Sequence, residues 1–259
     1  MKLHLPAATA QYTRNTSVEL ALLAAGALAG GFVNGLTGFG FALMSAGFWL
    51  IILPPTTVVP LMATCMACGQ LLTMPRIWRM IEVRRVLPLT LGGLIGVPFG
   101  IAILPHVPLP QFKTGVALLI CLNLLFVLVL QKHMSLPRSA ERFHFPVGIL
   151  SGVFGGISAL SGVVTTIWAG LFGWTKQEKR GVFQAFNLSM ALFSLCLFSY
   201  WGFLDKQFVY TALFVIPLTL IAATIGLRVF ERMGNAGFTK LINLLLGLSA
   251  LNLLVSVFF

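Results

Sequence analysis

Two polar, glycine-rich stretches interrupt the apolar sequence, and both have the composition of an anion-binding element. The first is Asn34-Gly35-Leu36-Thr37-Gly38-Phe39-Gly40, and the second is Gly155-Gly156-Ile157-Ser158-Ala159-Leu160-Ser161-Gly162. Glycine disfavours a continuous helix, so each stretch predicts a break in the chain with a new helix beginning behind it. The first amides of a helix have no internal partner and carry about half a positive charge. Two such helix starts facing one cavity would bind an anion without lysine or arginine.

The candidate site residues come from these two stretches and from the helix that follows the second. The predicted substrate-binding residues are Asn34, Thr37, Gly38, Phe39, Gly40, Ser158, Ser161, Gly162, Gln184 and Asn187. Thr37 and Ser158 are the expected N-caps of the new helices, and the amides after them would be free. Gln184 and Asn187 lie one turn apart and could share a face with the cavity. The competing interpretation is that glycine and serine only permit close helix packing.

Acidic and histidine side chains, which acid–base chemistry needs, are missing from the apolar segments. The acids and histidines fall at segment ends or in loops, namely Glu19, Glu82, Glu141, Glu178, Asp205, Glu231, His4, His106, His133 and His144. No ionisable residue is therefore expected at mid-membrane, where proton relays lie. Cys65 and Cys68 form a C-x-x-C pair without further ligands, which favours packing. We predict no catalytic residue, no metal and no cofactor.

Two alternatives from other functional classes remain. Ser161-Gly162 could belong to an intramembrane serine protease, but such an enzyme needs a base within reach, usually histidine, and no apolar segment contains one. A membrane scaffold or assembly factor without a cavity is the other alternative. Transport of labelled substrate into liposomes would separate a transporter from a scaffold.

The elements that must position the candidate residues are apolar helices. The chain has 259 residues, of which 58% are hydrophobic and 9% charged, and its mean hydropathy is +0.97. A soluble domain carries about 25% charged residues, whereas apolar runs of about 20 residues are typical of membrane-spanning helices. We predict an all-α polytopic membrane protein. Helices are expected at about 18–33, 39–53, 57–75, 86–104, 111–131, 146–157, 161–173, 181–200, 207–228 and 238–258.

An internal repeat divides the chain into two halves. The segment 88–91 recurs at 217–220, and 31–40 aligns with 152–161. The predicted organisation is an N-terminal tail (1–17), repeat 1 (18–131), a cytoplasmic linker (132–145) and repeat 2 (146–259). Each repeat comprises a broken, re-entrant hairpin, 18–53 or 146–173, followed by three transmembrane helices. Three spans are an odd number, so the two repeats should have inverted topology.

The positive charge follows membrane topology rather than nucleic-acid binding. The net charge is +11, and 13 of the 17 basic residues lie in loops 75–86, 132–144, 174–181 and 228–240. These loops are predicted to be cytoplasmic. Only 28 residues, 146–173, separate two of them, whereas two full spans need about 40 residues. This shortage is what predicts a hairpin that turns back inside the bilayer. The expected partners are a small anion and the lipid bilayer, with the chain a monomer or a homodimer.

The Gly-x-x-Asn-Gly-Leu-Thr-Gly-Phe-Gly motif at 31–40 and the Gly-x-x-Gly-Gly-x-Ser motif at 152–158 resemble the sulfite exporter (TauE/SafE) family. The resemblance spans residues 18–258, and the sequence departs from the glycine-dense second motif of many members at Ala159-Leu160. It implies a transporter of small sulfur-containing anions, such as sulfite or organosulfonates, in the bacterial inner membrane. It also implies that the two breaks are the binding elements.

Overall fold

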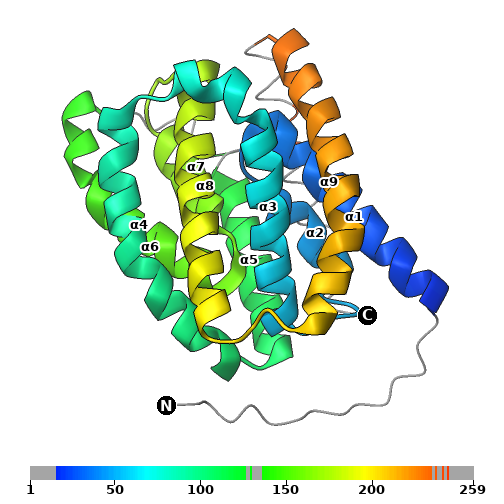
Figure 1. The fold of residues 1–259 in the computed structure, drawn as a ribbon. Coiled ribbons are helices and arrows are strands. Elements are labelled where there is room, and N and C mark those ends of the chain that lie inside the picture. Colours follow the sequence, from blue (N-terminus) through cyan, green and yellow to red (C-terminus); the bar gives the residue numbers. More distant parts are fainter. Residues whose placement is uncertain are drawn as a thin grey trace.

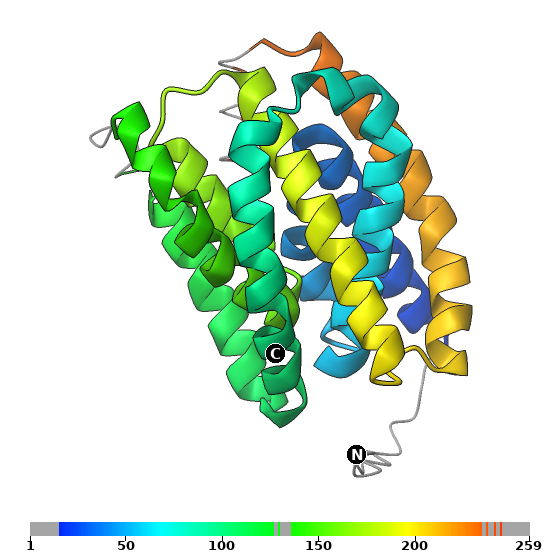
Figure 2. The same cartoon turned by 60° about the vertical axis from the view of Figure 1, so that its left-hand side comes forward.

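The computed structural model describes residues 16–126, 129, 136–234, 237, 241 and 244. Every regular element within these residues is a helix, and the long helices lie side by side in one bundle (Figure 1, Figure 2). Five helices are long and apolar enough to cross a membrane: 17–37, 55–80, 83–106, 176–200 and 206–232. The predicted all-α, multi-pass membrane architecture is therefore confirmed. The expected last span, 238–258, lies almost entirely outside the described residues.

The helices of the first part are α1 (Thr16–Thr37), α2 (Phe41–Trp49), α3 (Pro55–Ile77), α4 (Val83–Ile103) and α5 (Leu109–Leu125). Those of the second part are α6 (His144–Ser158), α7 (Ser161–Gly170), α8 (Lys176–Tyr200) and α9 (Lys206–Arg232). Two bounds differ from the prediction in a way that matters for the site. Helix α1 runs to residue 37 rather than 33, and α8 begins at 176 rather than 181.

Tertiary contacts keep α1 helical through the residues that were expected to break it. The side-chain nitrogen Nδ2 of Asn34 donates to the Met66 carbonyl, and its side-chain oxygen Oδ1 accepts a hydrogen bond from Gln70 on α3. Gly35 packs on the backbone of Ala223 in α9, where a Cβ would overlap the chain. Both residues were predicted to lie in unwound chain, because local helix propensity carries no information about partners on other helices.

Rows of regularly spaced glycines pack α4, from the first part of the chain, against α6, from the second part. Gly92, Gly96 and Gly100 of α4 lie against the backbone of α6, and Gly148, Gly152 and Gly156 of α6 lie against that of α4. A Cβ at any of these positions would overlap a main-chain oxygen of the partner helix. Such small-residue spacing lets membrane helices approach closely. The packing interpretation is thus correct for part of both motifs, including Gly35, Gly152 and Gly156.

Two helix pairs fold back on themselves inside the bundle. The indole nitrogen of Trp49, at the end of α2, donates to the carbonyl of Leu23 near the start of α1 at 3.1 Å. The amide of Leu136 bonds to the carbonyl of Leu171 at 2.8 Å, so the chain enters α6 and leaves α7 at one end. These contacts give two hairpins, α1–α2 and α6–α7. The inverted topology of the two repeats stays a prediction.

Polar contacts gather the basic loops at one end of the bundle. Arg85 at the start of α4 bonds to Glu178 at the start of α8 and pairs with Glu141. The ammonium of Lys176 donates to the carbonyls of Phe230 and Met233 at the end of α9. We refer to this end, formed by 75–86, 136–144, 174–179 and 228–234, as the basic end.

Candidate functional site

The hairpins break at two short segments, 38–40 and 159–160, that both use left-handed backbone. Gly38 has φ 77° and Gly40 has φ 84°, which suits glycine because it lacks a Cβ. Ala159 has φ 57° and is the one residue other than glycine with positive φ in the described part of the chain. Positions 38 and 159 are equivalent in the predicted repeat, and both have positive φ. The two breaks therefore begin with the same left-handed backbone conformation.

The predicted N-caps are wrong, because Thr37 and Ser158 end the first helices instead of starting the second ones. Their hydroxyls donate back to the carbonyls of Val33 and Phe154, each at 2.8 Å. The N-cap residues are Gly40 for α2 and Leu160 for α7, and neither forms a side-chain cap.

The amides just after Thr37 are also not free. The Gly38 amide bonds to the Asn34 carbonyl at 2.8 Å, and the Phe39 amide donates to the Thr37 hydroxyl at 3.2 Å. The first amides of α2, those of Phe41 and Ala42, have no acceptor among the described residues. The same holds for Ser161 and Gly162 at the start of α7. The free donors therefore lie at two helix starts, as expected, but a few residues later in the first hairpin.

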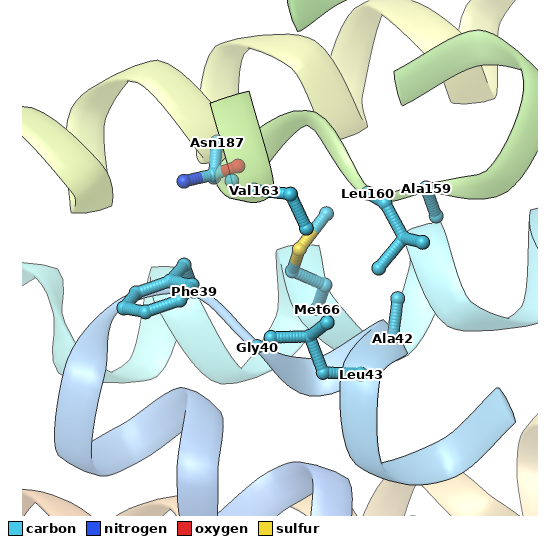
Figure 3. A pocket seen from close by; sticks show the side chains of 10 residues that line it. Phe39, Gly40, Ala42, Leu43, Met66, Ala159, Leu160, Val163 and Asn187 are labelled. Atoms are coloured by element: carbon cyan, nitrogen blue, oxygen red, sulfur yellow. The ribbon is translucent and has the colours of Figure 1, made fainter. Parts of the chain in front are cut away.

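The two breaks meet around one small cavity. It is lined by Phe39, Gly40, Ala42, Leu43, Met66, Ala159, Leu160, Gly162, Val163 and Asn187. Figure 3 shows the α2 side chains facing Leu160 and Val163 across this space, with Asn187 reaching in from α8. The start of α7 packs directly on the first break, since a Cβ on Gly162 would lie 2.8 Å from the Cβ of Phe39.

The cavity has a very small volume. The space open to the centre of a water molecule is about 10 Å³, which is room for about one water. Its walls are mostly apolar, with Asn187 as the polar side chain. An oxyanion would fit only after the walls move apart, and it would then meet the amides in a medium of low dielectric constant.

The structure brings only part of the predicted set to this cavity. Phe39, Gly40, Gly162 and Asn187 line it. Asn34, Thr37, Gly38, Ser158, Ser161 and Gln184 are buried around it without lining it. Sequence reasoning missed the apolar lining residues, since a leucine or valine beside a break looks like any other membrane-helix residue.

The predicted polar residues form hydrogen bonds that hold the two breaks in place. Gln70 donates from Nε2 to the Asn34 side chain and to the Gly38 carbonyl at 2.9 Å. Gln184 donates to the Gln70 carbonyl at 2.6 Å, so α8 supports α3 and through it the first break. Ser161 donates to Asn187 Oδ1 at 2.8 Å and holds that side chain at the cavity. These bonds position the site.

Arg180 is the functional candidate that sequence reasoning missed. It was assigned to a cytoplasmic loop, and no ionisable side chain was expected inside the bundle. Because Thr175 and Glu178 form a capping box, α8 starts earlier and Arg180 lies within it, fully buried. Its Nη2 donates to the Gly35 carbonyl at 2.9 Å. The spacing of Arg180, Gln184 and Asn187 puts them on one helix face, but this signal points to Arg180 only once the start of α8 is known.

Within the described residues, no histidine or carboxylate bonds to Ser161 as a catalytic base would. Its hydroxyl bonds to Asn187. His144, predicted to be peripheral, is buried against Trp168, Phe172 and Trp174. It begins α6, whose full length of about 21 Å separates it from the break after Ser158. Within the described residues, no group of His, Cys, Asp and Glu could hold a metal ion.

Comparison with known proteins identifies the family. The model of the family described as "Sulfite exporter TauE/SafE" matches residues 22–253, which include both breaks and all lining residues of the cavity. No curated protein and no solved structure gives a match. A family match over most of the chain, together with the broken hairpins and the membrane-spanning helices, leads to one conclusion: this chain belongs to the sulfite exporter TauE/SafE family.

Proposed function

We propose that this protein transports small sulfur-containing anions, such as sulfite or an organosulfonate, across the bacterial inner membrane. The cargo binds between the starts of α2 and α7, and the basic end faces the cytoplasm. The observation that carries the proposal is the meeting of two helix starts, with unpaired amides, around one cavity. The family match supports the same class of cargo.

The anion is held by backbone amides and their helix dipoles. Phe41 and Ala42 contribute donors from α2, and Ser161 and Gly162 contribute donors from α7. An N-terminus favours negative charge by about 0.3–1 kcal/mol in exposed sites and more in buried ones. Four donors from two directions suit an oxyanion with several oxygen acceptors better than a halide ion.

The small size of the cavity bears on how alternating access would work. With room for about one water, it cannot hold an oxyanion in this arrangement, so the hairpins must move before cargo binds. Movement of one hairpin against the other would separate Phe39 from Gly162 and open the cavity to one end of the bundle at a time. Glycine at 162 permits the closed contact.

Transport by purified protein tests the proposal. The full-length chain is reconstituted into liposomes of phosphatidylethanolamine and phosphatidylglycerol that contain unlabelled sulfite, and uptake of radiolabelled sulfite is followed. We expect saturable uptake above that of empty liposomes, with competition by organosulfonates. Absence of uptake for both sulfite and sulfonates would overturn the proposal and favour the scaffold alternative.

A further inference from the structure

We propose that Arg180 forms a second anion subsite, which binds the oxyanion cargo between the cavity and the basic end. This inference rests on the proposed transport of sulfur-containing anions. It adds a charged side chain to a site otherwise made of backbone amides. Nothing in the family match assigns such a role to this residue.

The guanidinium of Arg180 is buried with hydrogen-bonding capacity left over. Its exposed fraction is 0%. One nitrogen, Nη2, donates to the Gly35 carbonyl, whereas Nε and Nη1 have no partner among the described residues. Unpaired buried donors are costly, and a buried charge without a partner is more costly still. The arrangement is explained if the oxygens of an anion accept hydrogen bonds from Nε and Nη1 during transport.

The chain offers no carboxylate for this cation. All six acids lie in the described residues, and Glu82, Glu141 and Glu178 pair with Arg85. Glu231 is exposed and lies near Arg76. The other two acids begin helices far from Arg180: Asp205 caps α9, and Glu19 lies about 24 Å along α1 from Gly35.

A purely structural role accounts for only part of this geometry. Gly35 lies in the last turn of α1, where an arginine favourably meets the negative end of the helix dipole. That interaction uses Nη2 and leaves Nε and Nη1 unexplained. The ring of Phe230 lies 5.5 Å from the guanidinium carbon and supplies no hydrogen-bond acceptor oxygen.

The position of Arg180 suits binding of the anion on its path between the cavity and the basic end. Its Nη1 lies where a Cβ of Gly38 would be, directly behind the first break. Asn187, which lines the cavity, is about 10 Å further along α8. On the other side, the start of α8 belongs to the basic end. The ring of Phe230 lies over Arg180 there, and Phe230 itself packs with the buried side chains of Leu36, Ile77 and Leu227.

The cargo that suits this subsite is a small oxyanion with concentrated negative charge. Hydrogen bonds from a guanidinium to an anionic oxygen are charge-assisted and stronger than those from neutral amides. Sulfite and the head group of a sulfonate both have this chemistry. A neutral sulfur compound would gain nothing from Arg180 and should not compete for transport.

Kinetics of sulfite uptake in proteoliposomes test the role of Arg180. The variants are Arg180→Gln and Arg180→Lys, and the control is Arg85→Lys, which changes a buried arginine paired with three carboxylates. We expect Arg180→Gln to raise KM about 10- to 100-fold, the range for a lost hydrogen bond to a charged group. Arg180→Lys keeps the charge and should recover part of this loss. Arg85→Lys should lower the unfolding temperature and leave KM unchanged.

Thermal unfolding in detergent gives a second readout. Sulfite should raise the Tm of the wild-type protein through ligand linkage, and should raise that of Arg180→Gln and Arg180→Lys much less. Lysine retains the charge and a donor for the Gly35 carbonyl, so this variant decides the question if the glutamine variant does not fold.

Two outcomes distinguish a failure of this inference from a failure of the proposed function. If wild-type protein carries sulfite and both Arg180 variants keep the wild-type KM, Arg180 is only a structural residue and this inference is wrong, while the proposed function stands. If the wild-type protein carries no anion, the proposed function itself fails before any variant is compared.

Discussion

Each of the two chain breaks places a helix start at the cavity, but different residues form and support the two breaks. The first uses two glycines in left-handed backbone. Gln70 donates to the carbonyl of Gly38 in this break, and Arg180 donates to the carbonyl of Gly35 on the helix that precedes it. The second uses Ala159, an unfavourable residue for that backbone, and no charged side chain bonds to it among the described residues. The first break is therefore supported by a buried cation that lies behind it and outside the cavity lining, whereas the second has no such support within the described residues.

This difference shows that two breaks with similar backbone conformation can have different charged side chains around them. Both breaks place a helix start at one cavity, but a buried cation lies behind the first alone within the described residues. We infer that charge recognition belongs to the first break. Substitutions at matched positions of the two breaks can test this difference.

Gly38→Ala should have the largest effect. Alanine is strained at φ 77°, and its Cβ would overlap Nη1 of Arg180. Together these effects should destabilise the protein by about 3 kcal/mol. Thermal unfolding in detergent measures the loss, and uptake should fall with it. Gly115→Ala is the control, since a Cβ there meets no atom within 4 Å. Equal stability of the two variants would contradict this account of the first break.

Gly162→Ala should come next, because it acts where the start of α7 packs on the first break. Its Cβ would lie 2.8 Å from the Cβ of Phe39, and the backbone of the two hairpins must shift to relieve the contact. Such overpacking costs about 1–2 kcal/mol. We expect sulfite uptake to fall while the protein still folds. Wild-type uptake kinetics in this variant would show that this contact does not matter for transport.

Ser161→Ala should have a moderate effect that is mainly visible in KM. The change removes the hydrogen bond to Asn187 and leaves the amide oxygen of that side chain unpaired at the cavity. One hydrogen bond is worth about 1 kcal/mol, so KM should rise about fivefold. Ser189→Ala, on α8 with a hydroxyl bonded within its own helix, is the matched control. A KM that is equal in both variants would remove Asn187 from the site.

Ala159→Gly should have the smallest effect and the opposite sign to Gly38→Ala. Glycine relieves the strain at φ 57°, and its greater freedom in the unfolded chain offsets part of the gain. A net stabilisation of about 0.5 kcal/mol is expected, seen as a slightly higher Tm. A clear loss of stability would mean that the methyl group of Ala159 has a packing role that outweighs its strain.

The sequence predicted the helical membrane class and helix breaks within 34–40 and 155–162, because hydropathy and glycine content are local properties, whereas the re-entrant nature of the two hairpins stays a prediction. It also predicted that residues from both breaks would gather with Asn187, although Thr37 and Ser158 proved not to be N-caps. The extent of α1 could not be predicted, since Asn34 and Gly35 are held in the helix by α3 and α9.

Arg180 shows most clearly what local patterns miss. Basic residues near a helix end are normally assigned to the cytoplasmic loop. Its burial depends on the early start of α8 and on the space that Gly38 leaves on another hairpin, more than a hundred residues away in the sequence. The spacing to Gln184 and Asn187 was present in the sequence but had no meaning without that start point.

The most direct test of the shared anion site is a structure of the wild-type protein with selenite, an anomalous scatterer that mimics sulfite. The account predicts an anomalous peak between the starts of α2 and α7, with oxygens at hydrogen-bond distance from the amides of Phe41 or Ala42 and of Ser161 or Gly162. A bound selenite that touches neither helix start, in a protein that transports it, would contradict the central claim.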